Sequence, residues 1–518
     1  MTATGRGPDV IVVGAGPTGV VAASLLAAYG VRCLVLDRWH EAYPQPRAVH
    51  LDDEIYRILG RLGLADDFAA ISRPARGLRL IDRQHRTLAE FSRDRLVGVH
   101  GYPQANMFDQ PELEQLLRTR LAREDAVRFV GGAEVTAVAN VAHGRAEVTY
   151  RDTGSGTEHR TTAAFVLGCD GANSVVRSAI GARMVDKGFE QRWLVVDVET
   201  GVPIDAWEGV HQLCDTHRAG TYMRIGDRRY RWEFRLLDGE TAADFGDLDA
   251  IRPLIAPWTG PCDAADLTLR RVTDYTFRAQ VADRWQDRRV LLLGDAAHLT
   301  PPFIGQGMGA GLRDALNLTW KIAGVLRGDL PEQWLATYET ERTRHAAELI
   351  RTAILLGRAM TQGGRAGDLA RRLIAPRLAS ARGLRAFVND AASPRLHGNT
   401  PALHTRRDRL AGSLCPNAVI GPDDAADRQP RFDDVALGRY VLVCRGTLGQ
   451  HDRALVAQRG ALVLDAAEGT ALHAWLHDHH VMAALVRPDG TVARSGRASD
   501  LARAVPAYSP VHVIQNSN

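Results

Sequence analysis

Apolar runs alternate with glycine-rich turns at the start of the chain. Residues 10–13 (VIVV) and 33–36 (CLVL) are short apolar runs, and residues 17–28 between them have the small and apolar side chains of a buried helix. An apolar run, a glycine turn, a helix and a second apolar run form the pattern of a βαβ unit. The sequence therefore predicts an α/β fold.

The pattern changes further along the chain. Amphipathic helices are predicted over residues 54–69 and 111–123, and helical patterns rich in arginine extend over 312–390. Residues 190–237 alternate between apolar and polar positions with turn residues between the runs, which indicates a sheet-rich middle domain. The C-terminal residues from 431 onward return to short strands around a helix, so they predict a small α/β unit.

Charge and cysteine content narrow the class of protein. Of 518 residues, 64 are Lys or Arg and 61 are Asp or Glu, and the net charge of +3 does not favour nucleic acid or membrane surfaces. The six cysteines contain no C-x-x-C spacing, which is typical of reduced structural thiols. Since neither a signal peptide nor a membrane span is evident, we expect a soluble cytoplasmic protein. His473, His477 and His480 share one predicted helix face without further ligands, so we expect no metal.

The first glycine motif follows the first predicted strand. Gly14, Gly16 and Gly19 form G-x-G-x-x-G and open the predicted helix, and Asp37 ends the next strand. Glycines at these positions allow a tight turn, close approach of a pyrophosphate to the backbone and close helix–strand packing. A carboxylate at the end of the second strand can hydrogen-bond a ribose diol. The motif predicts a dinucleotide site for either FAD or NAD.

Two further turns carry an acid after a predicted strand. Asp170 and Gly171 follow residues 163–168 (AAFVLG), and Asp295 follows residues 289–293 (RVLLL). The D-G pair alone predicts only a turn. After Asp295, glycines at 305, 307, 309 and 311 leave backbone N–H groups open where a helix begins, and such a helix start binds anions. The missing side chains predict a ligand that lies against bare backbone.

These three motifs, in this order, resemble those of the single-component FAD-dependent aromatic hydroxylases with the para-hydroxybenzoate hydroxylase fold. The resemblance covers about residues 8–350. The stretches PRAVHLDDE (46–54), NMFDQPELEQLLR (106–118) and RWEF (231–234) are similar to 3-(3-hydroxyphenyl)propionate hydroxylases and related polyketide and phenol hydroxylases. The resemblance implies a Rossmann-like FAD-binding domain, an interleaved β-sheet substrate domain, a long helical segment and a thioredoxin-like C-terminal domain. Without C-x-x-C, that last domain is expected to be structural.

The resemblance also implies domain boundaries. The FAD-binding domain with its helical extension would comprise residues 1–75, 100–185 and 286–395, and the substrate domain residues 76–99 and 186–285. A linker over 396–430, where the composition shifts toward Pro, Asp and Asn, would lead to the C-terminal domain over 431–518.

Roles for individual residues come from the same resemblance. Asp295 would bind the ribityl chain with Gln110, Arg47 would touch the pyrophosphate, and the amides of Met308 and Gly309 would face the flavin N1–C2=O. Many relatives have Asn in place of Gly309, so a side-chain contact near the pyrimidine ring would be lost. The residues expected to bind FAD are Gly14, Gly16, Pro17, Thr18, Gly19, Asp37, Arg38, Arg47, Gln110, Asp170, Gly294, Asp295, Pro302, Gly305, Gly307, Met308 and Gly309.

Catalytic and substrate-binding residues are expected on the other side of the flavin. The catalytic candidates are His50 and Pro302, and the candidate substrate contacts are Tyr222, Trp232, Phe234 and Phe303. Pro302 would lie beside the isoalloxazine ring, and His50 follows the Arg47 loop, which in this fold reaches under the flavin toward the substrate. With an ordinary pKa of about 6.5, an imidazole is mostly neutral at neutral pH and can accept a phenolic proton. Ordinary packing remains an alternative for His50 and for the aromatic residues.

The activity implied by the resemblance is that of a monooxygenase. NADH or NADPH would reduce FAD, and O2 would add to the reduced flavin as a C4a-hydroperoxide that hydroxylates a phenol similar to 3-hydroxyphenylpropionate. Two alternatives stay open: a hydroxylase of polycyclic aromatic or polyketide natural products in antibiotic biosynthesis, and a non-catalytic flavin-binding assembly protein. The expected partners are a small aromatic substrate and O2, without nucleic acid or membrane, and we consider a homodimer.

Overall fold

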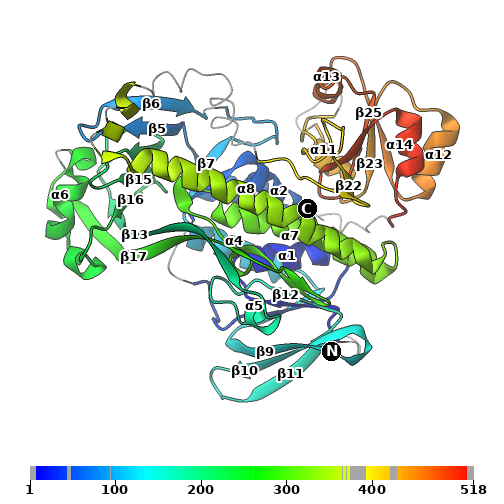
Figure 1. The fold of residues 1–518 in the computed structure, drawn as a ribbon, viewed down its shortest axis with the longest axis horizontal. Coiled ribbons are helices and arrows are strands. Elements are labelled where there is room, and N and C mark those ends of the chain that lie inside the picture. The colour runs from blue at the N-terminus through cyan, green and yellow to red at the C-terminus, as the bar shows by residue number, and fades with distance from the viewer. Residues whose placement is uncertain are drawn as a thin grey trace.

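The computed structural model describes residues 7–43, 48–93, 95–260, 262–364, 366–368, 370–373, 393–420 and 429–509. Arg47 lies outside the described residues. Three larger sheets organise the chain, and the long helices α7 (Gly307–Arg327) and α8 (Ala336–Thr361) run between them (Figure 1). The mixed α/β fold predicted from the sequence is confirmed.

The N-terminal sheet has the strand order β18-β19-β12-β1-β2-β8. All neighbours in it pair in parallel except β18, a short antiparallel edge strand. Its inner strands are buried along their whole length, which explains their unbroken apolar sequences. The strands are β1 (Val10–Val13), β2 (Cys33–Leu36), β8 (Val127–Val130), β12 (Phe165–Gly168), β18 (Gln286–Asp287) and β19 (Val290–Leu292).

Each of the three motifs follows a strand of this sheet. Gly14 follows β1, Asp170 lies just beyond β12, and Gly294 lies just beyond β19. Because these strands are adjacent and parallel, their carboxyl ends meet at one edge, where such sheets bind ligands. The helices α1 (Pro17–Ala28) and α7 (Gly307–Arg327) also begin at this edge, and they cross closely: a Cβ on Gly311 would lie 2.2 Å from Thr18 Oγ1.

Some elements differ from the sequence-based expectation. Residues 54–69 belong to two helices, because Gly63 has φ of +74° and interrupts the helical pattern. Residues 133–163, to which no structure was assigned, form an antiparallel three-stranded sheet. The helices are α2 (Asp53–Arg61), α3 (Ala65–Ile71), α4 (Gln110–Leu121) and α5 (Val175–Ala179). The strands of two smaller sheets are β9 (Ala133–Val141), β10 (Arg145–Asp152) and β11 (Glu158–Ala163), and β3 (His50–Asp52), β7 (Ala105–Phe108) and β4 (Ser72–Pro74).

The middle of the chain forms an eight-stranded sheet in the order β20-β17-β13-β16-β15-β14-β5-β6. One of its faces packs against α6 (Leu248–Thr259) in a core that includes Leu194, Trp232 and Trp258. The strands are β5 (Gly77–Ile81), β6 (Thr87–Ser92), β13 (Met184–Thr200), β14 (Val210–Leu213), β15 (Gly220–Arg224), β16 (Arg229–Arg235), β17 (Leu267–Ala282) and β20 (His298–Leu299).

This core contains a buried histidine that should make stability depend on pH. Trp258 Nε1 donates to His211 Nδ1 at 3.2 Å, and His211 Nε2 lies 3.2 Å from the carbonyl oxygen of Trp207. Because the indole N–H can only donate, His211 Nδ1 accepts and the ring is neutral. Burial, with the nearby charge of Arg79, lowers the pKa of His211 to about 4.

We therefore expect acid to destabilise the fold through His211. In the unfolded chain histidine has a pKa of about 6.5, so between that pH and about 4 the unfolded state binds more protons. The free energy of unfolding then falls as the pH falls, by about 1.4 kcal/mol per pH unit from this group. Urea unfolding at several pH values should show a shallower slope in His211→Gln and an unchanged slope in His451→Gln, which alters an exposed histidine. Equal slopes in all three proteins would contradict the assignment.

The C-terminal unit is a four-stranded sheet in the order β24-β23-β25-β26 with helices beside it. β23 pairs with β24 in parallel and with β25 antiparallel. Residues 396–420, expected as part of a linker, pack on this unit: Gly412 N donates to Val492 O at 2.8 Å. The elements are β21 (Asn399–Thr400), β22 (Leu403–His404), α11 (Phe432–Ala436), β23 (Val441–Arg445), α12 (Gln450–Gln458), β24 (Leu462–Ala466), α13 (Ala471–Asp478), β25 (Ala483–Val486), β26 (Val492–Gly496) and α14 (Ala498–Ala504).

Buried ion pairs attach this unit to the rest of the molecule. Arg57 and Arg61 of α2 both donate to the carboxylate of Asp433, at 2.7–2.8 Å. Glu341 of α8 (Ala336–Thr361) accepts from Arg487 at 3.0 Å. None of the helices in the described part of the chain combines the length and the apolar surface that a bilayer crossing requires. Nor do the described residues gather three or more His, Cys, Asp or Glu into a metal-binding group.

Candidate active site

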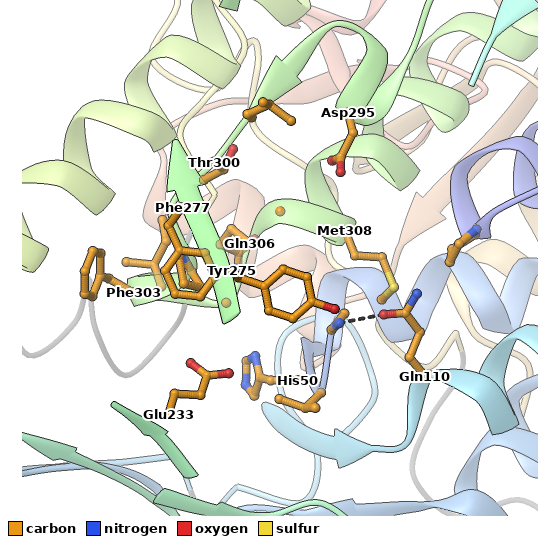
Figure 2. A pocket seen from close by; sticks show the side chains of 18 of the residues that line it. His50, Gln110, Glu233, Tyr275, Phe277, Asp295, Thr300, Phe303, Gln306 and Met308 are labelled. Atoms are coloured by element: carbon orange, nitrogen blue, oxygen red, sulfur yellow. Dashed lines mark hydrogen bonds between the residues drawn. The ribbon is translucent and has the colours of Figure 1, made fainter. Parts of the chain in front are cut away.

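A cavity of about 1150 Å³ lies between the carboxyl edge of the N-terminal sheet and one face of the eight-stranded sheet. The glycine motifs line one part of it, and strands β5, β13, β15 and β16 line the other. In Figure 2, Asp295, Met308 and Gln110 lie on one side of the cavity and Phe303, Phe277 and Glu233 on the other. The volume exceeds the usual 300–1,000 Å³ of small-molecule sites, so it suits two ligands side by side.

The first glycine motif forms a tight turn with bare backbone toward the cavity. Gly14 has φ of +98°, and a Cβ there would lie 2.4 Å from the carbonyl oxygen of Cys169. Gly19 does not line the cavity. A Cβ at Gly19 would lie 1.9 Å from Gly14 O, so the missing side chain allows the helix to pack closely against the turn. Beyond Gly16 the space within 4 Å is open, and no side chain caps the first amides of α1. Asp37 holds the turn, because its Oδ2 accepts from Ala15 N at 2.5 Å.

Other residues predicted to bind FAD also line this part of the cavity. Pro17, Thr18 and Arg38 line it, and Gln110 accepts from Ala48 N at 2.6 Å. Two lining residues were missed in the sequence: Glu114, which accepts from Gln110 Nε2 at 2.6 Å, and Arg118, which donates to Ala15 O at 3.2 Å. Both lie on α4 at the i+4 and i+8 positions from Gln110, a helical spacing that could have identified them.

Asp170 lines the cavity but uses its carboxylate for local structure. Its Oδ1 accepts from the Ser174 hydroxyl at 2.5 Å, and its Oδ2 accepts from Val176 N at 3.1 Å, which fixes the start of α5. Burial raises the pKa of Asp170 above its ordinary value, and these hydrogen bonds oppose the rise. The side chain therefore shapes the turn beside the cavity.

The third motif presents a carboxylate and an open helix start. Asp295 points into the cavity (Figure 2). The preceding Gly294 has φ of +61°, and its N–H donates to the buried Asp314 at 3.0 Å. The first turn of α7 has no side-chain cap, because the side chain of Gln306 instead bonds Asp52 at 2.8 Å. Positive helix ends at α1 and α7 therefore face one cavity.

Glycines in this motif serve different purposes. Gly307 has only Thr300 O near its Cβ position, at 3.9 Å, so its backbone is open toward the cavity. Gly305 is left-handed, with φ of +62°, and its Cβ position lies 3.0 Å from His50 Nδ1. Gly309 is buried and does not line the cavity: a Cβ there would lie 3.0 Å from both Arg313 Nη1 and Ile55 Cγ1. A side chain at this position would therefore require Arg313 or Ile55 to move.

These residues fit a flat dinucleotide cofactor. Open backbone at Gly16 and Gly307, two uncapped helix starts and the carboxylate of Asp295 supply donors for phosphates and ring carbonyls and an acceptor for ribityl hydroxyls. Side chains at the two glycines would occupy the space that a ring or a phosphate needs. The site therefore has room and polarity for FAD.

Tyr222, Trp232 and Phe234, which were predicted to contact the substrate, do not line the cavity. All three are at most 2% exposed and pack on the opposite face of the sheet, against α6. Side chains alternate between faces along a strand, so their neighbours face the cavity instead. The cavity-facing residues are Trp193 and Val195 of β13, Thr221 and Met223 of β15, and Arg231 and Glu233 of β16. Phe303 does line the cavity, with its ring 5.8 Å from that of Trp193.

His50 and Pro302 both line the cavity, but the ordinary pKa assumed for His50 is wrong. Burial lowers the pKa of His50 to about 4, and the positive charge of Arg93 adds to this effect, while Asp52 opposes it. The imidazole is therefore neutral at neutral pH and a weak base. Sequence reasoning also missed Tyr275, whose hydroxyl accepts from Arg271 at 2.5 Å, and Glu233.

Comparisons with known proteins agree with this geometry. The family model described as "FAD binding domain" matches residues 8–353. The chain is 32% identical, over 97% of its length and 96% of the relative, to the "probable NADH-specific resorcinol 4-hydroxylase" of Rhodococcus jostii. It is 30% identical, over 96% of both chains, to a 3-(3-hydroxy-phenyl)propionate/3-hydroxycinnamic acid hydroxylase of Burkholderia vietnamiensis. Aklavinone-11 hydroxylase, solved with FAD and aklavinone, shares the fold with a TM-score of 0.78 at 22% identity, covering 97% of this chain and 99% of the other.

Proposed function

We propose that this chain, which belongs to the FAD binding domain family, hydroxylates the ring of a small phenol. That phenol would carry an oxygen or a side chain meta to its hydroxyl group. The chain is an FAD-dependent aromatic monooxygenase. The reaction converts a phenol, NAD(P)H, H⁺ and O2 into a hydroxylated phenol, NAD(P)⁺ and water. The observation that carries the proposal is that the three glycine motifs and an aromatic-lined sheet face meet in one cavity.

Bound FAD would supply the redox chemistry, which is reduction by the nicotinamide and activation of O2. The protein would hold it by three groups of contacts. Amides at the start of α1 would bind the pyrophosphate, Asp295 and Gln110 would bind the ribityl chain, and the Met308 amide at the start of α7 would face the flavin carbonyl. Pro302 would pack beside the ring.

The other part of the cavity suits an aromatic ring, and a ring bound there would displace water. Trp193, Phe277 and Phe303 form an aromatic wall there, with the ring centroid of Trp193 lying 5.9 Å from that of Phe277 and 5.8 Å from that of Phe303. Exclusion of water favours transfer of the oxygen to the ring over its release as hydrogen peroxide. We propose that neutral His50, beside Gly305, accepts a hydrogen bond that orients the substrate.

A panel of phenols tests the proposal. The purified protein should be yellow, and resorcinol or 3-(3-hydroxyphenyl)propionate should accelerate NADH or NADPH oxidation and give a product heavier by one oxygen. A polycyclic phenol is the second candidate, because the cavity is large and aklavinone-11 hydroxylase shares the fold over nearly the whole chain. Faster turnover with polycyclic than with single-ring phenols would favour that candidate. Failure of every phenol to stimulate the FAD-loaded protein would refute both.

The proposal extends to the state of the protein in the cell. All six cysteines are free thiols, which suits the reducing cytoplasm. We propose a cytoplasmic homodimer, on the resemblance to the family, and sedimentation of the purified protein measures its assembly.

Asp295→Ala is expected to weaken FAD retention more than Asp170→Ala. Asp295 points into the cavity, whereas the oxygens of Asp170 are used by Ser174 and Val176. Loss of one hydrogen bond to a charged group, about 1.5–3 kcal/mol, corresponds to roughly ten- to hundredfold in Kd. Flavin absorbance after dialysis measures the difference, and Asp274→Ala on exposed β17 serves as control. Equal losses from both variants would show that the roles are misassigned.

A further inference from the structure

Glu233 is a carboxylate that faces the substrate part of the cavity. It lies on β16 between Val195 of β13 and Thr221 of β15, its partners in the sheet register. All three line the cavity, and Figure 2 shows the carboxylate of Glu233 pointing into it. The position is close to the proposed substrate, away from the glycine motifs.

The carboxylate of Glu233 has no hydrogen bond and no ion pair among the described residues, although its polar neighbours do. Arg231 donates to both oxygens of Asp197 at 2.6 and 2.8 Å. The Thr221 hydroxyl donates to Gln212 Oε1 at 3.2 Å, and Gln212 Nε2 donates to Gly220 O at 2.9 Å. Glu233 is half-buried, and a carboxylate withdrawn in part from water is destabilised unless a ligand supplies a donor. The arrangement leaves both oxygens of Glu233 as acceptors for a bound molecule.

The charges around Glu233 set its basicity. Arg231 lies on β16, the strand that carries Glu233, while Asp197 lies on β13 and Arg271 on β17. His50 and Arg93 line the same cavity, from β3 and from the end of β6. Burial raises the pKa of Glu233 above its ordinary value, and Asp197 adds to the rise, against the opposing charges of Arg231 and Arg271. The carboxylate therefore holds a proton more readily than an exposed glutamate, whereas His50 holds one poorly.

We infer, on the basis of the proposed function, that Glu233 takes the proton of the substrate's phenolic hydroxyl during ring hydroxylation. As the ring carbon forms its bond to one oxygen of the activated O2, the O–O bond breaks and its electron pair stays with the second oxygen. The electron pair of the phenolic O–H bond moves into the ring, and the proton passes to the Glu233 carboxylate. The ring is then a dienone. When it becomes aromatic again, the sp³ carbon loses its proton through water to that second oxygen, which leaves as water, and the carbonyl oxygen regains a proton from Glu233. The residue ends unchanged.

Glu233→Gln tests the inference, because the amide has the same shape and cannot take the proton. A general base contributes about 10²–10⁴-fold, so hydroxylation should fall by that order while FAD content and the rate of FAD reduction by NAD(P)H stay unchanged. The phenol Kd, measured from the change in flavin absorbance, should move far less than the rate. The deficit should shrink for phenols of lower pKa and at higher pH, where phenolate is already present. Glu233→Asp, which keeps the carboxylate, should recover part of the loss.

Two comparisons separate the outcomes. Glu199→Gln, on the same sheet and paired with Arg270, should behave as the wild type. If the wild-type protein hydroxylates no phenol, the proposed function fails. If the wild type is active and Glu233→Gln is equally active, or loses the same factor for every phenol and pH, the inference is overturned. A deficit that depends on phenol pKa in His50→Ala but not in Glu233→Gln would also overturn it and would assign the proton to His50.

Discussion

Replacing Glu341 by alanine is expected to lower the free energy of unfolding by about 3–5 kcal/mol, the usual cost of removing one partner of a buried ion pair. Glu341 is fully buried and accepts hydrogen bonds from Arg487 at 3.0 Å, from Asn317 at 2.8 Å and from Lys321 at 3.3 Å. Burial lowers the pKa of Lys321 to about 8 even though the charge of Glu341 raises it. Without this carboxylate, two buried cations lose their shared counter-ion.

The loss should appear first at the contact between α8 and the C-terminal unit. Trp320 reports on it, because the Arg487 guanidinium lies 5.4 Å from the centre of its ring. Urea unfolding followed by tryptophan fluorescence measures the change. Glu348→Ala is the control on the same helix, since its pair with Arg344 is exposed and should contribute at most about 1 kcal/mol. Similar losses in the two variants would show that the buried cluster does not hold the unit in place.

The cofactor part of the site could be predicted because its determinants are local. Gly14, Asp170 and Gly294 each follow a short apolar strand, and a turn residue in such a place defines the backbone whatever the rest of the chain does. The parallel arrangement of the three strands then brings them to one edge. The family resemblance added the identity of the cofactor, which the spacing of the glycines left open.

The substrate part could not be predicted in the same way, because it depends on which face of a strand meets which surface. The sequence RYRWEFR (229–235) alternates aromatic and charged residues. In most sheets such a pattern places aromatic residues in the core and charges in water. Here the charged face borders a cavity, so Arg231 and Glu233 line that cavity and Trp232 does not. Only the position of α6 on the other face reveals this.

Contacts between residues that are far apart in the chain could not be predicted from the sequence either. Arg57 and Asp433 are 376 residues apart in the chain and yet share a bidentate ion pair. No spacing rule connects them, because their contact depends on how α2 meets the C-terminal unit. The same limit applies to His50, whose low pKa arises from burial by residues distant in sequence. Local patterns therefore identified motifs, and tertiary packing decided their electrostatics.

Asp314→Ala is expected to impair FAD binding and stability together, although Asp314 does not line the cavity. Its Oδ2 accepts from Gly294 N at 3.0 Å and from His298 Nε2 at 2.8 Å, and its Oδ1 accepts from Arg342 at 2.8 Å. Burial raises the pKa of Asp314, but Arg342 and His298 more than offset this and keep it below its ordinary value. Removal of the carboxylate leaves a buried arginine without its counter-ion, a cost of about 3–5 kcal/mol.

The effect on FAD follows from the position of Gly294. The hydrogen bond from the Gly294 N–H to Asp314 fixes the turn that directs Asp295 into the cavity. A loosened turn should therefore weaken FAD retention by about tenfold or more. Asp314→Asn should also be impaired, because its amide N–H2 would face either the Gly294 N–H or the Arg342 guanidinium, donor against donor. FAD titration and thermal unfolding measure the two effects, with Asp329→Asn, beyond the other end of α7, as control. A variant that is destabilised but binds FAD as tightly as the wild type would show that the turn keeps its shape without Asp314, and that Asp295 is positioned by other contacts.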